Sequence, residues 1–78
     1  MKIIRLKRGE APETAKIISI DRLAGGLLMW TGSIDIDGKA AFGFSRGSFD
    51  TIEEAEEDAI LWASRRGAAE IIIESDDA

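Results

Sequence analysis

The hydrophobic pattern of this 78-residue chain changes its period once, just after Gly47. Before that point, residues 28–34 alternate between apolar and polar or small side chains, as a strand with one buried face does. After it, apolar residues recur at helical spacing over residues 52–63, and residues 68–75 hold three consecutive isoleucines. Such a run is typical of a strand buried on both faces, which belongs inside a sheet. One helix between strands restricts the chain to an α+β fold in which the helix covers one face of a sheet.

Two more strands are expected before residue 28. Residues 2–7 and 15–23 are rich in isoleucine and leucine, and each run is followed by glycine. The expected order is β-β-β-β-α-β: an antiparallel β-meander of four to five strands with one helix packed on one face. If the last strand joins in parallel, its crossover should be right-handed. We expect a single domain over residues 1–78 with a frayed acidic tail at 76–78.

Asp37 and Gly38 mark a hairpin turn that allows two registers. A two-residue loop places Phe42 and Phe44 on the sheet face opposite Trp30. A three-residue loop with a left-handed Gly38 at a bulge places all three aromatic residues on one face and sets opposite charges across from each other. We favour the three-residue loop on these grounds.

Thr51 and Glu54 have the spacing of a capping box, in which the threonine oxygen accepts a helical N–H and the glutamate returns to the threonine N–H. The helix should therefore begin at Thr51 and end at Gly67. Its apolar stripe consists of Ile52, Ala55, Ala59, Trp62 and Ala63. Because three of these are alanines, the helix can lie close to the sheet.

The chain has no cysteine and no histidine, which excludes disulfides, Cys/His zinc sites, thiolate nucleophiles and imidazole bases. Asp35 and Asp37 lack the further acids of a calcium loop and are explained by the turn. Ser45 and Arg46 lie near glycines but without the lysine and spacing of a P-loop. We therefore expect no enzymatic activity, no metal and no cofactor.

The longest apolar stretch, residues 23–30, is too short to cross a membrane, which takes about 20 residues. Residues 1–8 lack the pattern of a secretory signal. Together with the missing cysteines, this indicates a cytoplasmic protein.

The net charge of −5 is unevenly distributed. Residues 1–22 hold six bases and three acids, whereas residues 23–78 hold four bases and twelve acids. The acidic field favours a basic partner and disfavours direct contact with nucleic acid. One alternative is a nucleic-acid-binding module that uses the N-terminal bases Lys2, Arg5, Lys7, Lys16 and Arg22.

The expected partner-binding residues lie on the helix, outside its apolar stripe. They are Glu53, Glu54, Glu57, Asp58 and Leu61. Leu61 lies roughly 150° from the centre of the stripe, beside the acids, where it would form the apolar centre of a contact with a basic partner. The same residues would otherwise form only a solvated helix surface. Leu27 and Met29, on the other face of the sheet, are a second candidate contact, most simply for a homodimer.

Residues 51–55, Thr-Ile-Glu-Glu-Ala, follow a meander and precede a final strand, and this arrangement resembles the helix start of HicB-type antitoxin domains over about residues 27–75. That resemblance implies masking of a small basic ribonuclease toxin. The small size, acidity and element order are also similar to phage-encoded anti-CRISPR proteins, especially inhibitors of type I Cascade complexes. This second resemblance, which we favour, implies a non-catalytic inhibitor that blocks a basic host protein or ribonucleoprotein complex in the host cytoplasm.

Overall fold

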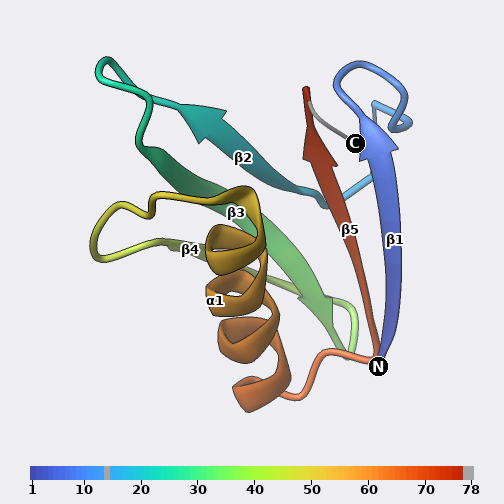
Figure 1. The fold of residues 1–78 in the computed structure, drawn as a ribbon. Helices are drawn as coiled ribbons and strands as arrows, with labels where there is room; N and C mark the ends of the chain where they lie inside the picture. Colours follow the sequence, from blue (N-terminus) through green and yellow to red (C-terminus); the bar gives the residue numbers. More distant parts are fainter. Residues whose placement is uncertain (14, 77–78) are drawn as a thin grey trace.

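The computed structural model describes residues 1–13 and 15–76, which form one five-stranded sheet and one helix (Figure 1). In chain order the elements are β1 (Lys2–Lys7), β2 (Ile18–Arg22), β3 (Leu28–Ile36), β4 (Lys39–Phe44), α1 (Ile52–Arg65) and β5 (Glu70–Ser75). The helix packs on one face of the sheet, so the predicted α+β class and element order are confirmed. Residues 77 and 78 of the predicted acidic tail lie outside the described residues.

The sheet is mixed, with strand order β1-β5-β2-β3-β4, and the prediction of an antiparallel meander is wrong for the first and last strands. β2, β3 and β4 are antiparallel neighbours, but β5 lies between β1 and β2 and runs parallel to both. The physical reason is the helix: α1 carries the chain back along the sheet, so β5 starts where β4 started and points the same way. The interior position predicted for the isoleucine-rich strand is confirmed.

The β3–β4 hairpin has the two-residue loop, and the favoured three-residue register is wrong. Ile36 pairs with Lys39, and both loop residues, Asp37 and Gly38, have positive φ values of 50° and 84°. These are the dihedrals of a turn whose twist matches that of the strands it connects. Phe42 and Phe44 consequently lie on the sheet face that α1 does not cover.

Gly43 explains why the phenylalanines face outward. It lies on the helix-covered face of β4, where a Cβ would come within 2.4 Å of the Trp62 ring. The indole fills the space that a phenylalanine would occupy in the other register. Trp62 also packs against the buried Trp30, with ring centroids 4.9 Å apart.

The predicted apolar stripe of α1 is confirmed. Ala55, Ala59 and Ala63 are fully buried, while Ile52 and Trp62 pack at the margin of the core. The largest fully buried side chains beneath the helix are Trp30, Ile18, Ile34 and Ile73. Small residues on α1 and large ones on the sheet thus interlock in a close-packed core.

Both helix ends were predicted correctly. The Thr51 hydroxyl oxygen accepts the Glu54 N–H at 3.2 Å, and the Glu54 carboxylate accepts from that hydroxyl rather than from the expected Thr51 N–H. At the other end Gly67 adopts a φ of 85°, and Gly67 and Ala68 donate to carbonyls of the last turn. These bonds satisfy terminal groups and fix the ends of α1.

Candidate functional site

The outward side of α1 carries a surface that we call the acidic helix surface, made of Glu53, Glu54, Glu57 and Leu61. All four side chains are exposed, and Leu61 exposes 48% of its area. The helical spacing that buries the alanine stripe turns these residues to solvent. The exposure of Leu61, expected from its angle on the helix, is confirmed.

Asp58 does not belong to this surface. It is half-buried, and its carboxylate accepts a hydrogen bond of 2.8 Å from the indole Nε1 of Trp30. A buried tryptophan needs an acceptor for its N–H, and Asp58 is placed on the margin of the stripe to supply it. The helical angle alone assigned Asp58 to solvent, whereas its partner comes from β3.

The carboxylates of α1 differ in how far they are compensated. Glu56 pairs with Arg5 at 2.9 Å, and Glu54 is engaged at the N-cap. Within the part of the chain that the structure describes, the carboxylates of Glu53 and Glu57 form no ion pair or hydrogen bond. Their negative charge is therefore not neutralised by a neighbouring base and is exposed to solvent. Leu61 lies one helical turn after Glu57.

An open groove of about 660 Å³ runs between α1 and the end of β4. Its lining residues are Trp30, Phe44, Arg46, Gly47, Phe49, Asp58, Leu61, Trp62, Arg65 and Arg66. Arg66 lies over the Trp62 ring, 5.4 Å from its centroid. The groove is thus mixed, with aromatic walls and three guanidinium groups, and Leu61 links it to the acidic helix surface.

Sequence reasoning missed this groove. In sequence, Arg65 and Arg66 are explained by the dipole at the end of the helix, and Arg46 by a strand end that leads into a turn. Each explanation is physically sound by itself, but only the packing of α1 against β4 brings the three arginines to one place. The cluster of arginines, tryptophan and phenylalanine is visible only in the folded structure, and no local sequence pattern indicates it.

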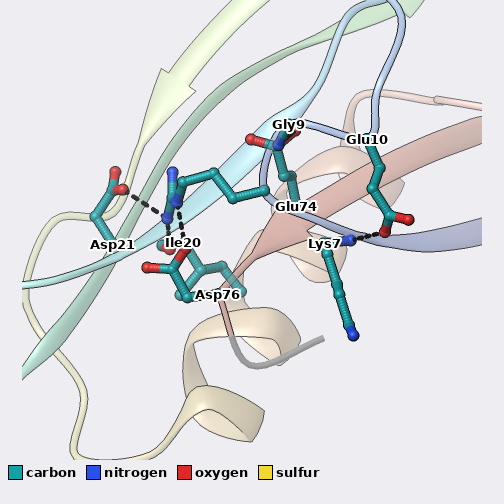
Figure 2. A network of polar contacts seen from close by, with 8 residues as sticks. Lys7, Gly9, Glu10, Ile20, Asp21, Glu74 and Asp76 are labelled. Carbon is teal, nitrogen blue, oxygen red and sulfur yellow. Dashed lines mark hydrogen bonds and ion pairs between the residues drawn. The ribbon is translucent and has the colours of Figure 1, made fainter.

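Three of the six bases in residues 1–22 form ion pairs with carboxylates that the structure describes, and Arg8 is the most engaged of them. Asp21, Asp76 and the Ile20 carbonyl converge on the Arg8 guanidinium, with Asp76 at 2.7 Å (Figure 2). The hydrogen bond to Asp76 raises the pKa of Arg8, and the negative charge of both carboxylates adds to this shift.

The other bases of that segment do not form one patch. Arg5 pairs with Glu56, Lys16 lies 4.0 Å from Asp35, and Arg22 donates to the Gly26 carbonyl. These contacts tie the first two strands to the rest of the fold. Lys2 and Lys7 are exposed and form no ion pair within the described residues, so the alternative in which the N-terminal bases bind nucleic acid stays a prediction.

On the uncovered sheet face, the proposed homodimer contact is only partly exposed. Leu27 exposes 38% of its area and Met29 is half-buried. Phe42 and Phe44, on the same face, expose 78% and 68%. The most exposed aromatic residues of this face are therefore on β4.

A scan against models of known protein families finds no match, and neither curated proteins nor solved structures give one. Across residues 1–13 and 15–76, no helix is long and apolar enough to span a membrane. The same residues contain no group of three or more side chains suited to hold a metal ion. The chemistry of the surfaces themselves is therefore the basis for the function proposed next.

Proposed function

We propose that this chain is a small non-catalytic binding protein that blocks a larger basic, nucleic-acid-handling protein, in the manner of anti-CRISPR inhibitors. The contact is the acidic helix surface. One observation carries the proposal: Leu61 is half-exposed next to Glu57, and neither Glu57 nor Glu53 has a partner within the described residues. Uncompensated charge around an apolar anchor is typical of surfaces that are steered onto a partner.

The helix is suited to this role because it is rigidly mounted. Its alanine stripe lies against the sheet, Thr51 caps its start, and Gly67 closes its end. A surface that is already ordered loses little conformational entropy on binding. The carboxylates should govern association, and Leu61 should govern how long the complex lasts.

The partner should present a basic surface with an apolar pocket for Leu61. A type I Cascade complex fits the anti-CRISPR resemblance, and a small basic ribonuclease fits the HicB resemblance. Both partners would meet the same acidic helix surface. They differ in the biological effect of blocking, which makes the two functions separable.

The test expresses the chain in a host whose type I CRISPR system restricts a targeted phage. We expect the chain to restore plaque formation and Glu53→Lys/Glu57→Lys to abolish the effect. The matched control is Glu13→Lys/Glu70→Lys, which changes the charge equally at exposed residues outside α1. An inactive wild-type chain, or equal loss in both double variants, would refute the proposal. Rescue of cells from a HicB-partner ribonuclease toxin instead would establish the antitoxin function.

A further inference from the structure

Two phenylalanines stand out on the uncovered sheet face. Phe42 and Phe44 occupy alternate positions of β4, so their rings project from the same face, and they expose 78% and 68% of their area. Gly43 between them faces the helix. Burial of these rings is therefore not what holds the fold together.

Among residues 1–13 and 15–76, no strand pairs with the outer edge of β4. β4 is the last strand of the sheet, with β3 as its sole neighbour in the strand order. The Ser45 N–H donates to the Trp30 carbonyl, and in an antiparallel pair the residues that bond to the neighbour alternate along the strand. Phe42 and Phe44 therefore direct their own N–H and C=O groups away from β3.

Three arginines line the groove together with Phe44. Arg46 follows β4, and Arg65 and Arg66 come from the end of α1. None of the three forms an ion pair with any carboxylate that the structure describes. The one carboxylate in the groove, Asp58, is bound to the Trp30 indole. A negatively charged ligand is thus the electrostatic complement of this edge.

We propose that the β4 edge binds single-stranded nucleic acid. Bases stack on Phe42 and Phe44, and the arginines of the groove contact phosphates. Aromatic residues on an open sheet face stack successive bases in single-stranded RNA recognition, and guanidinium groups next to such rings hold the backbone. The net charge of −5 is an average over the surface, and Glu53 and Glu57, on the first turns of α1, are not among the residues that line the groove.

A second copy of the chain is the alternative occupant of an open strand edge. The three arginines of the groove, which form no ion pair within the described residues, favour a phosphate backbone, and light scattering distinguishes the two occupants. The groove shares Leu61 with the acidic helix surface but none of its carboxylates, and the inference goes beyond the proposed function.

The test measures fluorescence anisotropy of labelled oligothymidine and oligouridine, each about 12 nucleotides long, a length within the range of single-strand sites. We expect saturable binding that weakens between about 50 and 200 mM salt. Phe42→Thr/Phe44→Thr removes both rings and puts β-branched residues, which also favour strands, in their place. It should weaken binding at least about 25-fold, since one stacked base contributes about fivefold or more. Leu23→Ala/Leu27→Ala, which removes exposed apolar area elsewhere, should bind as wild type does.

The charge arm uses Arg46→Ser/Arg65→Ser, with Lys2→Ser/Lys7→Ser on the opposite edge strand as the control. The groove pair should weaken binding and reduce the salt dependence by about one ion per lost phosphate contact, and the control pair should not. Three results would overturn the proposal: no binding at about 100 µM protein and low salt, equal binding of the double threonine variant, or equal affinity for duplex DNA. Light scattering that shows a dimer in the wild type and a monomer in the threonine variant would overturn it in favour of self-association.

Discussion

Replacement of Gly43 by alanine tests how β4 lies against α1. An added Cβ would come within 2.4 Å and 2.5 Å of two Trp62 ring carbons, and 3.0 Å from its Nε1. Carbon atoms in contact normally lie about 3.5–4.0 Å apart, so the ring would have to move by about 1 Å. Trp62 packs against Trp30 and lies beneath the Arg66 guanidinium, and these contacts restrict that movement.

The expected cost follows from two opposing effects. Overpacking of a well-filled site costs about 1–3 kcal/mol. Alanine loses less backbone entropy than glycine in a strand, which returns about 0.5–1 kcal/mol. Because an approach of 2.4 Å lies at the severe end of overpacking, Gly43→Ala should lower the free energy of unfolding by about 1–2 kcal/mol. In a chain of this size, each kcal/mol corresponds to a Tm lower by about 4–8 °C, and urea unfolding followed by circular dichroism would measure the loss.

Two controls isolate the steric cause. At Gly47 an added Cβ would meet no atom within 4 Å and φ is not positive, so Gly47→Ala should cost nothing. Trp62→Leu removes the obstructing ring, and Gly43→Ala in that background should cost less, with a coupling of about 1 kcal/mol. If Gly43→Ala is as harmless as Gly47→Ala, or equally costly without the Trp62 ring, the described packing is refuted.

Three further substitutions test local features by their urea midpoints. Thr51→Ala should cost about 1 kcal/mol and Ser48→Ala almost nothing, because only Thr51 caps the helix; equal losses would move the helix start. Asp58→Ala should cost about 1–3 kcal/mol by leaving the buried Trp30 N–H without its acceptor, whereas Asp58→Asn keeps an acceptor and should cost less; equal costs would contradict the bond. Gly38→Val should cost more than about 1 kcal/mol because φ there is 84°, and a neutral result would exclude the turn.

The helix was predictable because its signals are local. Thr51, the alanine stripe and Gly67 all act within a turn or two of each other, and each has a physical meaning that does not depend on the rest of the chain. The exposure of Leu61 follows from the same periodicity. Local chemistry therefore predicts the element and the direction that its residues face.

Strand pairing depends on distant segments and was not predictable to the same depth. The insertion of β5 between β1 and β2 brings residues near both ends of the chain together. Parallel strands are not joined by a short turn, so no local sequence pattern predicts their pairing. The hairpin register was decided by Trp62, which occupies the space over Gly43. The three-residue register, with Phe42 and Phe44 on the same face as Trp30, would be favourable only if the space over Gly43 were empty.

The position of each charge also depends on contacts between segments that are distant in sequence. Asp58 was grouped with its neighbours in sequence, yet its partner is Trp30, 28 residues away. Arg46 and Arg65 come from different elements and meet only when α1 packs beside β4. Composition gives the net charge, but the fold decides where each sign accumulates.

Removing the negative charge of Glu53 and Glu57 should weaken binding at one proposed surface and strengthen it at the other. One double variant therefore tests both proposals. Glu53→Lys/Glu57→Lys shifts the net charge by four positive units without touching the core or the β4 edge. Association with a basic partner should slow by on the order of tenfold, because exposed charges steer encounter. Oligonucleotide binding should instead tighten by about two- to threefold at low salt, since repulsion of phosphates is removed, and the gain should vanish once screening shortens to about 8 Å at 0.15 M. Loss of oligonucleotide binding in this variant would mean that the two surfaces are not separate.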